Sequence, residues 1–261
     1  MKKGLEMEIP VYAPIHGFSF DRERLLREIE EKCSEEVVER SVVFKDQKSI
    51  HDCEVPLKIA SDEQLKETTH YEEENGQMIT KTGKFSTYRV LNMTRLEEDP
   101  VTTWHTYMER RGHKIAFWHY YRKPWIWMKE LENSYIREVV EQFPFEYVQT
   151  VRLITMRPPA IGQVHVDTPT RANNRWLEEG FASITLNVSS GGTLMRYLVE
   201  KDVFDADPEI PISHFNDAYR HGVPELKSTR HQIRIFGKMS RDKYLAMMDL
   251  KSAVWDAHAD V

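Results

Sequence analysis

Two residues of metal-binding types, His165 and Asp167, stand two positions apart in a β-prone segment. A strand sends alternate side chains to opposite faces, so these two are expected on the same face. A neutral imidazole and a carboxylate placed in this way can approach one metal ion. The pair alone is weak evidence, because the sequence holds another His-x-Asp at 258–260 and a His-x-Glu at 70–72.

A histidine and an arginine further along the chain separate this pair from the other two. After Asp167 the sequence predicts a polar loop, two strands and a long connection to His221, and Arg230 follows nine residues later at the head of a strand. Neither of the other pairs is followed by such a series. Two alternatives stay open: His214 in place of His221, and Arg234, in phase with Arg230 on the same strand face.

These residue types favour iron chemistry that uses a 2-oxoacid. Two histidines and one carboxylate on one face of an octahedral Fe(II) leave three adjacent positions open, enough for a chelating oxoacid and O₂. Cysteine ligands would instead favour zinc or an iron–sulfur cluster. The far carboxylate of 2-oxoglutarate needs a cation, and a guanidinium can hold it through two parallel hydrogen bonds. We therefore predict Fe(II) bound by His165, Asp167 and His221, with 2-oxoglutarate bound by Arg230.

This ordered pattern resembles that of the Fe(II)/2-oxoglutarate-dependent dioxygenase superfamily. Residues 151–167, VRLITMRPPAIGQVHVD, are similar to bacterial cis-proline hydroxylases and to aspartyl/asparaginyl hydroxylase-like proteins, and the resemblance covers about residues 147–237. It implies a double-stranded β-helix (a jelly roll, cupin-like) with the metal between its sheets. It also implies that decarboxylation of 2-oxoglutarate is coupled to hydroxylation of an unactivated C–H bond. Halogenating members carry a small residue in place of the carboxylate, so Asp167 favours hydroxylation.

Several polar residues near the pattern are candidates for binding the substrate. Arg171 and Arg175 lie in the loop after the metal-binding pair, Arg157 precedes it, and Asn187 shares a strand face with Thr185. Each arginine can equally be a solvated surface group, and Asn187 a satisfied core group. With the resemblance, they favour a small polar metabolite, an amino acid or a compound derived from one. The alternatives are a protein or peptide substrate, and a jelly roll that binds a ligand without catalysis.

Composition narrows the class of partner. The net charge is −6 with no basic block, which argues against a nucleic-acid partner. Two cysteines do not make a disulfide framework. The N-terminus lacks the apolar run of a signal peptide, and no stretch of about 18 apolar residues could span a bilayer. We therefore expect a cytoplasmic protein with a small-molecule substrate and no membrane partner. The oligomeric state is not predicted.

The elements that must position these residues are mainly β. We predict one domain, 1–261, with a helical and strand support region (1–145), a metal-binding β core (146–238) and a C-terminal helix (239–261). In the support region we expect a helix at 21–33 capped by Asp21, loops over most of 35–75, a hairpin turning at 75–76 and a helix between Pro124 and Pro144. In the core we expect strands at 147–156, 162–167, 181–188, 193–199 and 229–236.

Overall fold

Antiparallel strands dominate the computed structural model of the chain, and short helices flank them. The structure describes residues 9–33, 38–44, 67–74, 77–97, 125–158, 162–165, 181–189, 195–199, 202–216, 219–224 and 226–255. The prediction of a mainly β fold with flanking helices is confirmed, whereas the more specific double-stranded β-helix stays a prediction.

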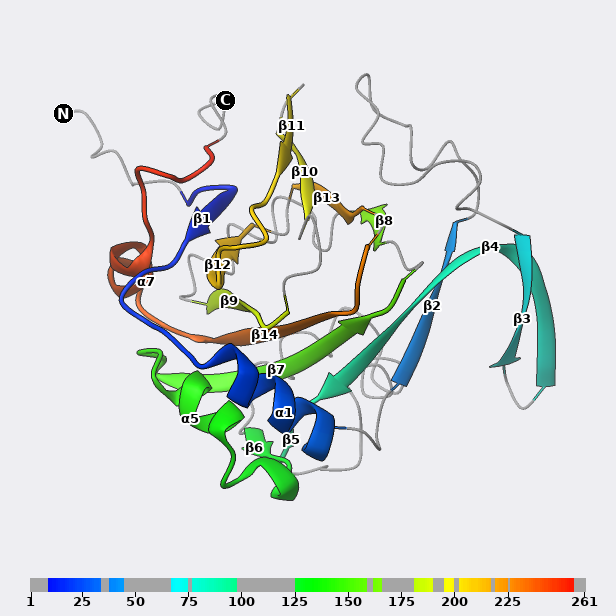
Figure 1. Cartoon of the computed structure of the whole chain (residues 1–261), viewed down its shortest axis with the longest axis horizontal. Coiled ribbons are helices and arrows are strands. Elements are labelled where there is room, and N and C mark those ends of the chain that lie inside the picture. The colour runs from blue at the N-terminus through cyan, green and yellow to red at the C-terminus, as the bar shows by residue number, and fades with distance from the viewer. Residues whose placement is uncertain are drawn as a thin grey trace.

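The main sheet contains eight strands among the described residues. Their order is β1 (Tyr12–Pro14), β12 (Ile212–Phe215), β9 (Phe181–Asn187), β14 (Arg230–Lys238), β7 (Tyr147–Met156), β4 (Gln77–Asn92) and β2 (Val38–Phe44), with β3 (Glu67–Glu74) also paired to β4. Figure 1 shows the β3–β4 hairpin projecting at one side of the molecule. The turn predicted at 75–76 lies outside the described residues, but Glu74 and Gln77 on either side of it are register partners, so the hairpin is confirmed.

A smaller sheet packs on one face of the main sheet. Its order is β11 (Asp202–Asp205), β10 (Arg196–Val199), β13 (Arg220–Val223) and β8 (Gly162–His165). Tyr197 on β10 meets Tyr12 and Phe215 of the main sheet, in each case with ring centroids 6.1 Å apart. Met156 on β7 packs with Leu226 just before β14. We call the main-sheet face that turns toward the smaller sheet the inner face.

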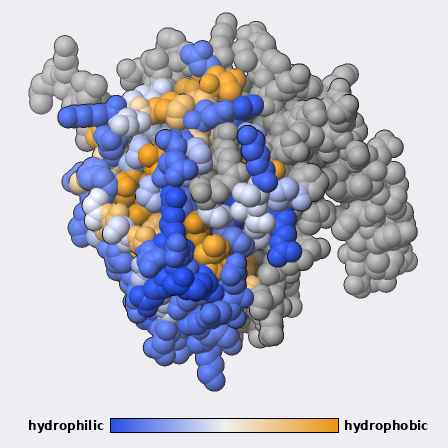
Figure 2. Space-filling model, viewed as in Figure 1, coloured by the Kyte–Doolittle hydropathy of each residue, from blue (hydrophilic) through white to orange (hydrophobic). Residues whose placement is uncertain are grey.

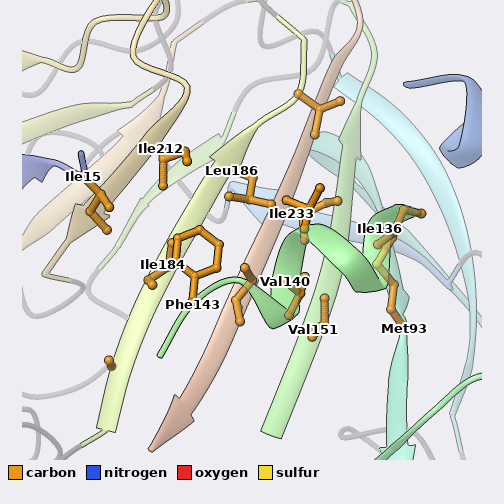
Figure 3. Packing of buried hydrophobic residues seen from close by; sticks show 14 of the residues in the cluster. Ile15, Met93, Ile136, Val140, Phe143, Val151, Ile184, Leu186, Ile212 and Ile233 are labelled. Carbon is orange, nitrogen blue, oxygen red and sulfur yellow. The ribbon is translucent and has the colours of Figure 1, made fainter. Parts of the chain in front are cut away.

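Helices cover the other face, here called the outer face. They are α1 (Arg22–Lys32), α5 (Tyr135–Glu141) and α7 (Arg241–Met247). Their apolar side chains form one core with those of β7, β9 and β14, as Figure 3 shows for Val140 and Phe143 against Ile184, Leu186 and Ile233. The solvent side of α1 and α5, low in the view of Figure 2, is largely hydrophilic. The hydrophobic effect therefore holds these amphipathic helices on the sheet.

Each of the three helices begins directly after a residue whose side chain caps it. The Asp21 carboxylate accepts a hydrogen bond from the Arg24 amide at 3.0 Å, which confirms the predicted cap of α1. Ser134 caps α5 in the same manner through the Arg137 amide, at 3.1 Å. Ser240 caps α7 through the Lys243 amide, at 3.4 Å.

Two predicted helices are shorter in the structure. Between Pro124 and Pro144 the chain forms β6 (Trp125–Trp127), a 3-10 turn η1 (Lys129–Leu131) and only then α5. The reason is that β6 pairs with β5 (Thr94–Leu96) and that Ser134 starts a new helix. The single helix predicted there is thus divided among a strand, a 3-10 turn and a shorter helix.

The helix predicted for 239–261 ends at Met247. Met248 instead forms a bridge with Ile15, and Val254 forms one with Tyr12. This part of the chain therefore pairs with the N-terminal segment around β1 rather than continuing as a helix. Residues 256–261 lie outside the described part of the chain.

Strands also occur where loops or connections were predicted. Within 35–75, β2 and β3 are strands, and both extend the main sheet through β4. The connection between the predicted strands at 193–199 and 229–236 contains β11, β12 and β13. Among the residues that the structure describes, no helix is both long enough and apolar enough to cross a bilayer.

Candidate metal and oxoacid site

Two of the three predicted metal ligands stand at opposed positions of the smaller sheet. In the register of β13 with β8, His221 pairs with His165. Opposed positions of an antiparallel pair lie on one face with Cβ atoms about 4.5–5.5 Å apart. Residues 56 positions apart in the sequence are therefore register partners in the sheet.

The surroundings of His221 fit a metal-binding imidazole. Its side chain is 2% exposed, and its Nδ1 lies 2.8 Å from the Tyr219 carbonyl oxygen. A carbonyl only accepts hydrogen bonds, so Nδ1 carries a proton, and Nε2 is the nitrogen that a neutral imidazole would offer to a metal. Such a bond to a backbone carbonyl is the usual way in which a ligand histidine is oriented.

His214, the alternative distal ligand, turns to the outer face. Its Nε2 lies 3.1 Å from the Pro10 carbonyl oxygen, and its Nδ1 lies 2.5 Å from the Tyr244 hydroxyl on α7. Burial lowers the pKa of His214 to about 4, with a further lowering from the charge of Arg234. Both ring nitrogens hold β12 to neighbouring elements, so the geometry favours His221 over His214 as the ligand.

Arg230 begins β14 on the inner face, opposite the smaller sheet. It is 3% exposed, and burial lowers its pKa to about 10, although Tyr197 acts in the opposite direction. The guanidinium therefore remains a cation at neutral pH in a place from which water is largely excluded. A carboxylate is the group that best matches such a cation, because it can accept two parallel hydrogen bonds.

Tyr197 is a candidate site residue that the sequence did not reveal. It is 1% exposed and is the register partner of His221 on β10, with ring centroids 6.2 Å apart. Its hydroxyl lies 3.4 Å from the Met195 sulfur, and its effect on Arg230 places it close to that guanidinium. The strand at 193–199 that contains Tyr197 was predicted, but the strand β13 that contains His221 was not. The pairing of the two residues could therefore not be inferred from the sequence.

Two of the predicted substrate residues lie in the described part of the chain. Asn187 is 1% exposed on the inner face; its amide donates to the Ile210 carbonyl at 2.7 Å and accepts from Gln232 at 3.3 Å. Thr185, two residues earlier, is also buried there. Arg157 is exposed just after β7. Burial lowers the pKa of His231, and the charge of Arg157 lowers it further. The His231 ring forms a hydrogen bond with Thr155 on the outer face, so Arg157 lies near that face. The structure thus brings Asn187, but not Arg157, to the inner face.

Asp167, Arg171 and Arg175 lie outside the described residues. In the segments that the structure does describe, no three His, Cys, Asp or Glu side chains gather as ligands of one ion. Four features nevertheless fit Fe(II) with an oxoacid: the opposed positions 165 and 221, the oriented imidazole of His221, the buried Arg230 and the adjacent Tyr197.

Comparisons with known proteins find solved structures only. The sequence matches no protein-family model and no curated protein. A prolyl-4-hydroxylase from Pseudomonas putida is 11% identical with a TM-score of 0.40, covering 88% of this chain and 93% of that chain. A 2OG-Fe(II) oxygenase family oxidoreductase from Burkholderia pseudomallei is 13% identical with a TM-score of 0.30, covering 68% and 76%.

A further similar structure is a prolyl hydroxylase from Trichoplax adhaerens, in complex with a peptide from the oxygen degradation domain of hypoxia inducible factor. It is 12% identical with a TM-score of 0.28, and the match covers 42% of this chain and 56% of that chain. These three structures come from the superfamily that the sequence pattern resembles.

Proposed function

We propose that the protein is an Fe(II)- and 2-oxoglutarate-dependent dioxygenase that hydroxylates an unactivated C–H bond of a small polar metabolite, an amino acid or a compound derived from one. The observation that carries the proposal is the opposed pair of positions 165 and 221, with the buried Arg230 across from them. Positions 165 and 221 lie on the smaller sheet and Arg230 lies on the main sheet, which supports an iron site with a cation for the far carboxylate of the oxoacid.

Each residue has a separate role in this proposal. His165, Asp167 and His221 would hold the iron, which supplies the oxygen chemistry when 2-oxoglutarate and O₂ are bound. Arg230 would hold the far carboxylate, and Tyr197 beside it would donate a hydrogen bond to the same group. The apolar rings of Phe215 and Tyr197 around His221 exclude water from the imidazole, which protects a reactive site from side reactions.

The experiment that tests the proposal uses the purified full chain. Under anaerobic conditions, Fe(II) and 2-oxoglutarate together should give a weak visible charge-transfer band, and in air the mixture should release succinate. Absence of both the band and succinate would overturn the proposed function.

The role of Arg230 is tested by replacing it with glutamine. Arg230→Gln removes the charge-assisted hydrogen bonds to 2-oxoglutarate, and a hydrogen bond to a charged group contributes about 1.5–3 kcal/mol. We therefore expect the concentration of 2-oxoglutarate that gives a half-maximal band to rise by roughly tenfold or more. Arg137→Gln is the control: Arg137 pairs with Glu141 on the exposed side of α5. Equal titrations for the Arg230 variant and the wild type would refute the assignment.

A further inference from the structure

We propose that the carboxamide of Gln232 on β14 binds a hydrogen-bond donor, an N–H or O–H group, of the substrate that is to be hydroxylated. Asn187 is the positioning residue that sets the orientation of this carboxamide. The inference rests on the proposed function and adds a chemical property of the substrate. Gln232 was not among the substrate residues predicted from the sequence, and Asn187 acts here through Gln232 rather than by contact with the ligand.

The two carboxamides form a chain of hydrogen bonds that ends at a backbone carbonyl. Gln232 and Asn187 are register partners on β14 and β9. Both lie on the inner face, because the adjacent residues Ile233 and Leu186 lie in the core beneath the helices. The Asn187 Nδ2 donates to the Ile210 carbonyl oxygen at 2.7 Å, and the Gln232 Nε2 donates to the Asn187 Oδ1 at 3.3 Å. The backbone before β12 is thus linked to a side chain of the inner face.

This chain of hydrogen bonds allows one orientation for each carboxamide. A backbone carbonyl only accepts, so the nitrogen of the Asn187 side chain faces Ile210 and its oxygen faces Gln232. An amide oxygen also only accepts, so the nitrogen of the Gln232 side chain faces Asn187. The Gln232 Oε1 therefore lies on the side away from Asn187. Loss of the Asn187 carboxamide would leave Gln232 free to turn its amide over.

The Gln232 Oε1 is an acceptor that the neighbouring strand does not serve. The register partner of Gln232 on β7 is Ile154, whose side chain has no donor. Within the described segments the structure shows no hydrogen bond to Oε1. Gln232 is 6% exposed and Asn187 only 1%. Because the Gln232 backbone lies between β7 and β9, this exposed area belongs to the side chain on the inner face. A ligand between the sheets thus reaches Gln232 rather than Asn187.

Gln232 lies within the candidate metal and oxoacid site. It follows Arg230 by two residues on the same strand face, so their Cα atoms are about 7 Å apart. Arg234, two residues further along, has its guanidinium carbon 4.2 Å from the ring centroid of Phe215. The Phe215 ring in turn lies 5.4 Å from that of His221, centroid to centroid. Gln232 therefore lies between the residue proposed to hold the oxoacid and a residue next to a proposed iron ligand.

An acceptor at this position distinguishes the two substrates of the proposed reaction. At neutral pH 2-oxoglutarate carries two carboxylates and a keto group, which only accept hydrogen bonds, so the Gln232 Oε1 cannot serve it. A polar metabolite with an amino, amide or hydroxyl group does offer a donor.

The cost of an unmet acceptor makes this contact selective. A ligand that covers the Gln232 Oε1 without offering a donor removes the oxygen from water and gives nothing in return. Sites that hydrogen-bond a substrate N–H or O–H group therefore reject analogues that lack this group. Gln232 would thus select the substrate to be hydroxylated, whereas Arg230 would select the oxoacid.

The test compares ligands that differ by one donor. Amino acids are paired with the same acids lacking the amino group, and hydroxy acids are paired with their O-methyl ethers. Each ligand is titrated calorimetrically into the anaerobic full chain with Fe(II) and 2-oxoglutarate. For the wild type we expect at least one donor-bearing ligand to bind about fivefold or more tightly than its partner. The two kinds of pair show whether the donor is an ammonium or a hydroxyl group.

Two variants assign the preference to these residues. Gln232→Met keeps the length of the side chain but removes the acceptor, so it should abolish the preference. Asn187→Leu lets the Gln232 amide turn its nitrogen to the ligand, so the preference should fall toward equality. A merely structural role would weaken both members of a pair alike and leave their ratio unchanged. Arg137→Gln, on the exposed side of α5, is the control and should match the wild type.

Melting curves establish that each variant is folded, and if Gln232→Met is not, the ratio in Asn187→Leu decides. The role of Gln232 is refuted if the wild type prefers no donor-bearing ligand, or if the preference persists in the folded variants. It is also refuted if Gln232→Met raises the 2-oxoglutarate concentration for a half-maximal charge-transfer band more than about threefold, because Gln232 then serves the oxoacid. Absence of the band in the wild type would refute the proposed function separately, because calorimetry measures ligand binding without turnover.

Discussion

At the scale of single residues, the two histidines His214 and His221 have opposite surroundings although they are seven residues apart. His221 keeps one ring nitrogen on a backbone carbonyl, as a ligand does. His214 engages both nitrogens in contacts that join β12 to α7 and to the N-terminal segment. The sequence left the two as alternatives because spacing alone does not show which side of a strand each imidazole takes.

Replacing each histidine should separate these roles. His221→Gln is expected to abolish the charge-transfer band of Fe(II) with 2-oxoglutarate, because a ligand is lost. His214→Gln should keep the band at temperatures below its melting point but lower the thermal stability. Absorption titrations and melting curves on both variants measure the two effects. A band lost with His214→Gln and kept with His221→Gln would reverse the ligand assignment.

The buried His214 also predicts how stability depends on pH. Its pKa falls from 6.5 to about 4 on folding, so between these values the unfolded chain binds more protons than the folded one. Its contribution to stability is therefore complete above about pH 6.5 and is lost as the pH falls toward 4. The full loss is roughly 3 kcal/mol.

Denaturant unfolding at pH 7 and at pH 4.5 can isolate this contribution. The stability difference between wild type and His214→Gln is expected to shrink at the lower pH, since only the wild type loses the contribution of the neutral imidazole. A difference that is constant across that window would show that the pKa of His214 is not lowered by folding.

At the scale of elements, the sequence predicted what local patterns determine. The cap Asp21 and the strands β7, β9 and β14 follow from residue type and alternation, and they are present. β11 and β13 are short strands inside a stretch for which the sequence predicted only a long connection. Because β13 was missed, the pairing of His221 with Tyr197 could not be predicted.

Gly237 marks a constraint between two elements. A Cβ at this position would lie 2.6 Å from the Tyr147 carbonyl oxygen and 2.7 Å from the Phe145 ring, close to the register shift between β14 and β7. Since backbone cannot move aside easily, Gly237→Ala should destabilise the fold by about 1–3 kcal/mol.

Thermal unfolding measures this effect, with Lys238→Ala as the matched control on the next residue. Lys238 is 41% exposed and its ion pair with Glu146 should contribute little. Equal melting temperatures for the two variants would mean that β14 and β7 can move apart at Gly237 without a loss of stability.

At the scale of the whole molecule, the main sheet has helices on one face and the smaller sheet on the other (Figure 1). The outer face contributes an apolar core with the helices, whereas the inner face carries buried polar groups such as Arg230, Gln232 and Asn187. A sheet face that collects buried polar groups contributes less to stability than an apolar face, which is typical of surfaces kept for binding. The amino-acid composition could not reveal this difference between the faces, because each strand contributes residues to both.

Adjacent residues on β9 offer a direct comparison of the two faces. Leu186→Ala on the outer face should lower the free energy of unfolding by roughly 2–5 kcal/mol, because it leaves a cavity in the core. Thr185→Val on the inner face removes a hydroxyl without a partner among the described residues, so stability should be unchanged or higher by about 1 kcal/mol. Denaturant unfolding of both variants gives these values, and a larger loss for Thr185→Val would contradict the division.

β14 has a further consequence for how this protein can change over generations. Its even positions carry Arg230, Gln232 and Arg234, and its odd positions carry Ile233 and Ile235. A single inserted or deleted codon within the strand would exchange the two sets, moving guanidinium groups into the apolar core and isoleucines to the inner face. Point substitutions therefore leave the division between the two faces intact, whereas a one-residue length change preserves it only where a β-bulge absorbs the extra residue.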